Sequence, residues 1–247
     1  MVIKIDIMVT DTFVHTHGSF ITTDSFGAGH AGDIRIHADI LRLEDLALIA
    51  SGAFASGNAG NITAEATQIV ITGGAGIDSS TFNRGQGGVV TVRASETVLL
   101  AGTTDDGLIS STISAQAEDV GQAGSVLVEG QTVMLTGGAT INSIALGPGN
   151  GGSVTVRASG AVILVGTNPD RSFPSSISSS SVGLTGPRSG NGGRILVEAQ
   201  RVEITEGAQI TSETLSTGHG GTITIRATDT VIVDGSDEAG IPGSGLG

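Results

Sequence analysis

The sequence predicts an all-β protein, a right-handed parallel β-helix of about eight coils with roughly 28 residues in each coil. Two observations carry this prediction: a glycine signature that recurs at a nearly constant interval, and apolar residues that alternate with polar ones after every copy. No segment shows a helical period, and connections between parallel strands are almost always right-handed, which gives the expected hand.

The signature is Gly, then His, Asn or Gln, then Ala or Gly, then Gly. Its seven copies open at Gly29, Gly57, Gly85, Gly121, Gly149, Gly190 and Gly218. The intervals are 28, 28, 36, 28, 41 and 28 residues, so two copies carry additions of 8 and 13. Residues 19–26 (SFITTDSF) parallel residues 76–82 (GIDSSTF), so residues 1–28 are expected to form one further, less regular coil.

The columns of the repeat predict strands and corners. The sixth position, always aliphatic and β-branched, is expected to form a single interior row of Ile34, Ile62, Val90, Val126, Val154, Ile195 and Ile223. Two more short strands are expected in each copy. Residues 69–72 are an example of the second strand, and residues 141–144, in a later copy, are an example of the third. The fourth position is always Gly, which indicates either a positive φ or a close backbone approach at a corner. We therefore expect a β-helix over residues 1–235 and a truncated Gly-, Pro- and Ser-rich loop or tail over 236–247. A β-sandwich is the alternative, but the Asn-Gly pairs at Asn150 and Asn191 lie inside the repeated corner rather than in hairpins.

Two outward columns are candidate structural ladders. The second position holds only imidazoles and amides, which we expect to hydrogen-bond from coil to coil: His30, Asn58, Gln86, Gln122, Asn150, Asn191 and His219. The ninth position, beginning at His37, alternates in charge through Glu65, Arg93, Glu129, Arg157, Glu198 and Arg226. Opposite charges on adjacent strands stabilise a sheet by about 0.2–1 kcal/mol per pair, so this alternation suits one repeat per coil.

Composition excludes several classes of protein. The net charge is −13 with a single Lys, which argues against nucleic-acid partners and against a polybasic membrane patch. No apolar run approaches the roughly 20 residues of a spanning helix, so no membrane insertion is expected. The chain has no Cys, and hence no disulfides or thiolate metal sites. The first ten residues, MVIKIDIMVT, predict a strand rather than an export signal.

Three groups of side chains are candidates for chemistry, and for each the structural interpretation is preferred. Asp105 and Asp106, with Glu118 and Asp119 in the same addition, form the best carboxylate cluster, but no Trp or Tyr is present to stack on sugar rings. Residues 73–78 match the start of a calcium-binding nonapeptide but lack tandem copies. His15 and His17, expected to share one face of a strand, lack a third ligand. No catalytic, cofactor or metal site is predicted.

The repeats resemble a known family. Residues 57–82 (GNAGNITAEATQIVITGGAGIDSSTF), residues 149–167 (GNGGSVTVRASGAVILVGT) and the loop NPDRSFPSSISSSS are similar to the haemagglutinin-type repeats of filamentous haemagglutinin-like exoproteins of two-partner secretion systems. The resemblance implies a right-handed parallel β-helix, secretion through an outer-membrane β-barrel transporter, a cell-surface location and adhesion to a host or cell-surface receptor. The signature of the family's secretion domain is not found, so a fragment of a longer exoprotein is expected.

The sequence thus predicts a non-catalytic, structural shaft segment of a surface-associated bacterial adhesin. The alternatives are a carbohydrate-active β-helix enzyme, either a polysaccharide lyase or a hydrolase, and a glycan- or protein-binding module. The binding module would use loops on alternate coils, within residues 103–120 and 167–189.

Overall fold

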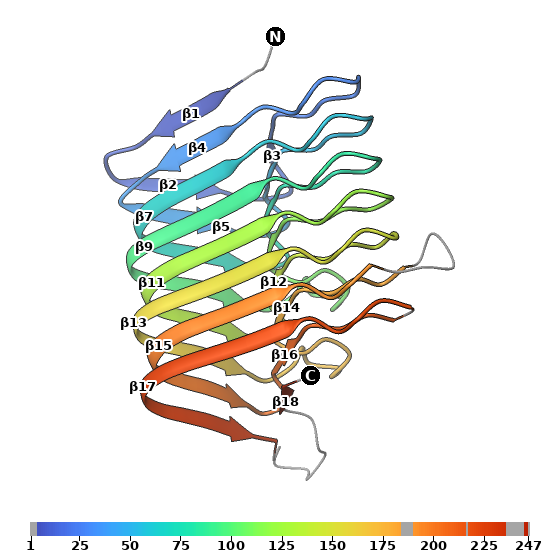
Figure 1. Cartoon of the computed structure of the whole chain (residues 1–247). Helices are drawn as coiled ribbons and strands as arrows, with labels where there is room; N and C mark the ends of the chain where they lie inside the picture. The colour runs from blue at the N-terminus through green and yellow to red at the C-terminus, as the bar shows by residue number, and fades with distance from the viewer. Residues whose placement is uncertain (1–3, 184–189, 216, 236–244, 247) are drawn as a thin grey trace.

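The computed structural model describes residues 4–183, 190–215, 217–235 and 245–246. Within these residues the chain forms a parallel β-helix whose coils stack along one axis (Figure 1), which confirms the predicted fold class. The described residues contain no helix that could cross a membrane. Most of the predicted tail at 236–247 lies outside the described residues.

One wall of the β-helix is a 10-stranded sheet. Its strands follow the order β1 (Ile5–Met8), β4 (Ile34–His37), β7 (Ile62–Thr72), β9 (Val89–Ala101), β11 (Ser125–Thr136), β13 (Ser153–Val165), β15 (Arg194–Thr205) and β17 (Thr222–Asp234). Beside this path, β2 (Thr12–His15) pairs with β5 (Ile40–Leu43), and β5 pairs with β7.

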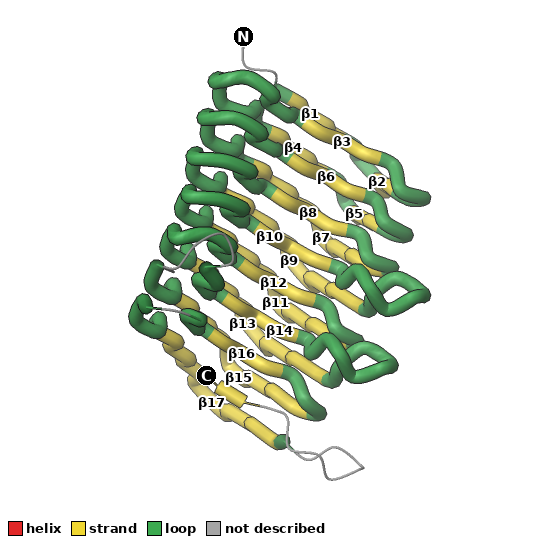
Figure 2. The backbone as a smooth tube through the Cα atoms, turned by 90° about the vertical axis from the view of Figure 1, so that its right-hand side faces the viewer, coloured by secondary structure: helices red, strands yellow, loops and turns green. Residues whose placement is uncertain are grey.

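The opposite wall is an 8-stranded sheet of short strands. In chain order these are β3 (Phe20–Thr22), β6 (Leu48–Ala50), β8 (Gly76–Asp78), β10 (Thr112–Ser114), β12 (Thr140–Asn142), β14 (Ser176–Ser178), β16 (Gln209–Thr211) and β18 (Gly245–Leu246). Figure 2 shows both sheets as parallel rows of strands joined by loops at the corners. We number the coils 1 to 8, coils 2 to 8 opening at the seven signature glycines.

The strand register confirms one repeat per coil. Ile34 pairs with Ile62, Ile62 with Val90, and the row continues without a break to Ile195 and Ile223. Ile5 precedes Ile34 in the same register, so residues 1–28 do contribute a coil. Because this interior row holds an aliphatic, β-branched side chain in every coil, each coil presents the same inward-facing row to its neighbours.

The expectation of three separate strands in each coil is wrong for coils 3 to 8. There the first two strands are one long strand that bends, as in the 13 residues of β9. The pairing register shifts at the bend, for example between Glu129 and Thr132, and continues beyond it. The small residue at the tenth position of these repeats lies at this bend, where ladder pairing is interrupted for one to three residues.

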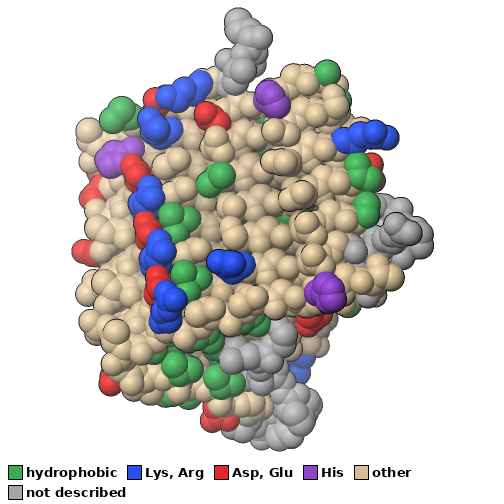
Figure 3. Space-filling model, in the orientation of Figure 1, with side chains coloured by type: hydrophobic (Ala, Val, Ile, Leu, Met, Phe, Trp, Pro, Cys, Tyr) green, Lys and Arg blue, Asp and Glu red, His purple; other side chains and the backbone are tan. Residues whose placement is uncertain are grey.

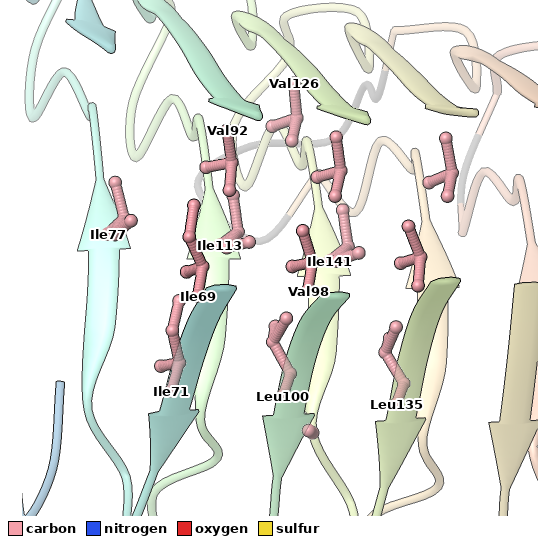
Figure 4. Packing of buried hydrophobic residues seen from close by; sticks show 14 of the residues in the cluster. Ile69, Ile71, Ile77, Val92, Val98, Leu100, Ile113, Val126, Leu135 and Ile141 are labelled. Carbon is pink, nitrogen blue, oxygen red and sulfur yellow. The ribbon is translucent and has the colours of Figure 1, made fainter. Parts of the chain in front are cut away.

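The two sheets contribute unequally to the core. In coil 4 the large sheet supplies Val90, Val92, Val98 and Leu100, whereas the short strand β10 supplies Ile113 alone, and all five are 0% exposed. Figure 4 shows these rows of aliphatic side chains meeting between the sheets. Each short strand from β3 to β16 therefore contributes one isoleucine to the small-sheet side of the core.

The fourth-position glycines are required by close backbone approach, not by a positive φ. None of them has a positive φ, but a methyl group on Gly124 would collide with the carbonyl oxygen of Gly88 in the preceding coil. The same collision recurs at Gly152 with the carbonyl oxygen of Gly124. The corner thus stacks backbone directly on backbone.

Buried hydroxyl groups satisfy the carbonyls of these glycines. Ser143 donates to Gly124 O at 2.8 Å and Ser179 donates to Gly152 O at 2.9 Å. Thr23, Ser51, Ser79 and Ser212 make the same bond to a signature glycine carbonyl. Within the described residues, only Ala115 interrupts this column, in coil 4. Gly124 O and Gly152 O also accept a backbone N–H from the next coil, so the serine hydroxyls are second partners of carbonyls at the corner.

The two additions differ from their expected placement. Loops 102–110 and 166–174 have the same length, and each is closed by an antiparallel bridge, Thr103 with Ser110 and Thr167 with Pro174. The rest of the larger addition lies after the short strand. Ser181 and Gly190 are nine positions apart, whereas their equivalents in the preceding coil, Ala145 and Gly149, are four positions apart. Residues 184–189 of that stretch lie outside the described residues.

Candidate functional site

The alternating charges of the ninth position form a continuous ladder of ion pairs on the large sheet. Arg93 lies between Glu65, at 3.6 Å, and Glu129, at 2.7 Å. Arg157 lies between Glu129, at 3.4 Å, and Glu198, at 2.8 Å, and Arg226 closes the row on Glu198 at 2.8 Å. Figure 3 shows the row as alternating red and blue side chains down one face.

The ladder perturbs the protonation equilibria of its members. The hydrogen bond from Arg93 is the main cause that lowers the pKa of Glu129, and Arg157 lowers it further. The hydrogen bond from Arg157 likewise lowers the pKa of Glu198, and the bond from Arg226 adds to it. The side chains are about a third to two thirds exposed, so solvent screens these pairs and each contributes modestly.

Reversing one charge tests the ladder. Arg93→Glu places three carboxylates in a row about 4.8 Å apart, and we expect a loss of about 1 kcal/mol in the free energy of unfolding at low salt. Denaturant midpoints at two salt concentrations measure it, and high salt should shrink the loss. The triple exchange Glu65→Arg, Arg93→Glu, Glu129→Arg should recover only part of it, because the new arginine faces Arg157. A single variant as stable as the wild type at low salt contradicts a stabilising ladder.

The lowered pKa of Glu129 predicts a pH dependence. A depressed carboxyl pKa adds stability that is present above the ordinary value of about 4.3 and is lost as the pH falls through the folded-state pKa. Glu129→Gln should therefore cost about 0.5–1 kcal/mol at pH 7 and much less at pH 3. Unfolding midpoints at the two pH values measure the difference, and an equal cost at both would show that Glu129 contributes through packing alone.

The second-position column bonds from side chain to backbone rather than from amide to amide. The backbone N–H of Asn58 donates to Nδ1 of His30, and that of Gln86 donates to Oδ1 of Asn58. Asn150 accepts from Asn191 N, and Asn191 accepts from His219 N, each at 2.9 Å. Among the described residues, the side chains of Gln86 and Gln122 make no such bond; their extra methylene carries the amide further from the next coil.

His15 and His17 do not lie on one face of a strand in the structure. His15 ends β2 and is 7% exposed, with its ring nitrogens 3.0 Å from Ser19 Oγ and 3.3 Å from Leu48 O. His17 lies in the following turn with φ 58°, so the expectation of a shared strand face is wrong. No group of three or more His, Asp or Glu side chains in the described ranges is arranged to hold a metal ion.

The predicted carboxylate cluster is divided between two corners. Asp105 and Asp106 lie in loop 102–110, before β10, whereas Glu118 follows β10 at its other end. Asp106 is engaged locally, because it accepts hydrogen bonds from Thr104 Oγ1 and from the backbone N–H of Leu108, and these lower its pKa. The four carboxylates therefore do not form one acid–base site.

The two loops pack across the coil that separates them. Asn168, 1% exposed, donates from Nδ2 to Gly107 O of the other loop at 3.3 Å. The turn beneath is Gly137–Gly138, and a methyl group on Gly138 would lie 3.0 Å from Asn168 Cβ. The loops of coils 4 and 6 therefore leave no room for a larger side chain than glycine at position 138 of the coil between them.

An open groove follows the bend of the large sheet. Its volume is about 930 Å³, and its lining combines charged and hydroxyl side chains, such as Glu65, Arg93 and Thr67, with apolar ones, such as Met8 and Ala94. A second hollow of about 660 Å³ continues along Arg157 and Glu198. The groove offers hydroxyls and charges that are already paired with one another, and it repeats from coil to coil.

An exposed stack of phenylalanines on the small-sheet side was not predicted. The rings of Phe26 and Phe54 are 4.8 Å apart at 12°, and those of Phe54 and Phe82 are 4.4 Å apart at 1°. Their exposed fractions are 76%, 40% and 40%. The sequence carried a signal for the stack, since these residues recur at the repeat interval of 28.

Comparison with known proteins finds no match: no family model, no curated protein and no solved structure is similar to this chain at a significant level.

Proposed function

We propose that this chain is a structural shaft segment of a secreted, surface-associated bacterial adhesin, and that it is not an enzyme. One observation carries the proposal: interior rows and exterior ladder run from coil to coil without interruption, as in the row from Ile34 to Ile223 and the ion pairs from Glu65 to Arg226. An enzyme concentrates its chemistry in one place and departs from the repeat there. A spacer needs only the repeat.

A coil-pair deletion tests the shaft. Removing residues 121–189 joins Val120 to Gly190 and takes out coils 5 and 6, so Arg93 would face Glu198 and Val90 would face Ile195. Since each coil contacts only its neighbours, we expect a folded, shorter rod. Small-angle X-ray scattering should show a length reduced by about 10 Å, two strand spacings.

The matched control removes one coil only. Deleting residues 121–148 joins Val120 to Gly149, which places Arg93 against Arg157 and brings the two loops together without the Gly137–Gly138 turn. This variant should have the lower denaturation midpoint, although it loses fewer residues. If the coil-pair deletion unfolds the chain, the coils are not interchangeable and the shaft proposal fails.

The remaining parts of the proposal rest on the resemblance of the repeats. They are secretion through an outer-membrane β-barrel transporter, location at the cell surface, and adhesion to a host or cell-surface receptor. The non-catalytic part is tested by incubating the protein with neutral and acidic polysaccharides. Depolymerisation that disappears in an Asp105→Asn, Asp106→Asn variant would support the carbohydrate-active alternative instead.

A further inference from the structure

Two carboxylates lie beside the phenylalanine stack without a cation to pair with. Asp78 ends β8, where its side chain is only partly exposed and accepts hydrogen bonds from Ser114 Oγ at 2.5 Å and Ser80 Oγ at 2.7 Å. Thr81 of coil 3 and Ala117 of coil 4 are bridge partners. Glu118 therefore has the same position in coil 4 that Phe82 has in coil 3. In the part of the chain that the structure describes, neither carboxylate forms an ion pair.

The environment of these carboxylates is unfavourable to negative charge. Burial raises the pKa of Asp78 and outweighs the two serine hydrogen bonds, and the charge of Asp24 raises it further. Burial also raises the pKa of Glu118, and the charge of Asp78 adds to the shift. Arg84 is exposed two residues after Phe82, yet it is in no ion pair with either group among the described residues. A cation supplied from outside would relieve this repulsion.

The neighbouring apolar surface is a stack of aromatic rings. The chain has six Phe and no Trp or Tyr, and three of the six, Phe26, Phe54 and Phe82, stack on one another while exposed. Exposed aromatic area at a fixed place commonly marks an interaction site. Phe54 and Phe82 lie in coils 2 and 3, and Asp78 and Glu118 lie in coils 3 and 4, so rings and carboxylates share one stretch of the rod.

We propose that the surface formed by Phe54, Phe82, Asp78 and Glu118, the acidic aromatic surface, binds an arginine side chain presented by a partner protein. A guanidinium group is planar, packs against aromatic rings and pairs with carboxylates through directed hydrogen bonds. The surface repels phosphate, and the described residues offer no set of three ligands for a metal ion. The site lies on the side of the rod and would add a lateral partner to the shaft; its failure would leave the shaft proposal unaffected.

The test uses the whole chain and a blocked peptide of sequence Leu-Arg-Leu-Arg-Leu. Carbon-13 NMR of the side-chain carboxyl groups follows the titration of Asp78 and Glu118, with and without the peptide. We expect binding to lower both titration midpoints. Glu118→Gln, which keeps the side-chain shape, should bind the peptide about tenfold more weakly, the loss of one charge-assisted contact. Phe54→Ser should weaken it as well.

Asp105→Asn is the matched control, because Asp105 is an exposed carboxylate at the other corner and its loss should leave binding unchanged. The peptide Leu-Glu-Leu-Glu-Leu should not bind. The proposal is overturned if the arginine peptide leaves both midpoints unmoved, if Glu118→Gln binds it as well as the wild type does, or if calcium chloride alone at matched ionic strength gives the same shifts.

Discussion

Replacing Gly124 with alanine is expected to lower the free energy of unfolding by about 3 kcal/mol, at the upper end of what overpacking costs. The added methyl group would collide with Gly88 O and would approach the backbone of Gly87, which belong to the preceding coil. Backbone atoms cannot rotate away as a side chain can, so the two coils would have to separate at the corner, and the bond between Ser143 and Gly124 would be strained as well. Chemical denaturation followed by circular dichroism measures the loss.

Gly220→Ala is the matched control. It changes a signature glycine of coil 8 whose added methyl group would meet nothing nearer than Ser212 O at 3.8 Å. Its stability should stay within about 0.5 kcal/mol of the wild type, as for an ordinary surface substitution. If Gly124→Ala is equally harmless, the invariance of the fourth position has another cause than backbone stacking.

Ile113→Ala is expected to cost about 2–5 kcal/mol, the range for truncating a buried aliphatic side chain. The loss should lie high in that range because Ile113 is the only large inward side chain of β10, so no neighbour in the same strand can fill the cavity. Ile77 and Ile141 above and below are themselves held in their own coils by the strand register.

The control for this change is Ile109→Ala in the same coil. Ile109 is 50% exposed in loop 102–110, so the substitution removes the same atoms from a side chain that contributes little to the core. Thermal unfolding of the two variants separates the effect of removing a buried side chain from the effect of the Ile-to-Ala change itself. Equal midpoints would contradict the packing described for the small sheet.

Repetition is what made the fold predictable. Because the sixth position is β-branched in every copy, its residues had only one arrangement that buries them all, and Ile62 lies between Ile34 and Val90 as expected. The same reasoning brought Arg93 between Glu65 and Glu129, since two positions in one column of a one-repeat coil must be adjacent.

Features set by the geometry of a corner were not predictable in this way. The serine column was overlooked because a buried hydroxyl and an exposed one look alike in sequence; only the position of Gly124 O shows why Ser143 is there. His17 was placed on a strand because the alternation was extended beyond the end of β2 into the turn formed by His17 and Gly18, whose φ angles are 58° and 64°. The exposed phenylalanines were overlooked because a recurrent Phe suggests a core position, whereas each of these follows a bridge residue at a corner, after the strand has ended.

The pairing of each strand with its equivalent one repeat away has a consequence for how the rod is made. The contacts between coils join residues one repeat apart, 28 positions at most steps and 36 or 41 where a coil carries an addition, so adding a coil closes a short loop whose entropic cost changes little from step to step. An existing coil offers both a row of unpaired backbone groups and a groove for the next isoleucine. Growth by templating at such an edge can proceed while the rest of the chain is still unfolded, one coil at a time in the order of emergence, with no need to bring distant parts of the sequence together.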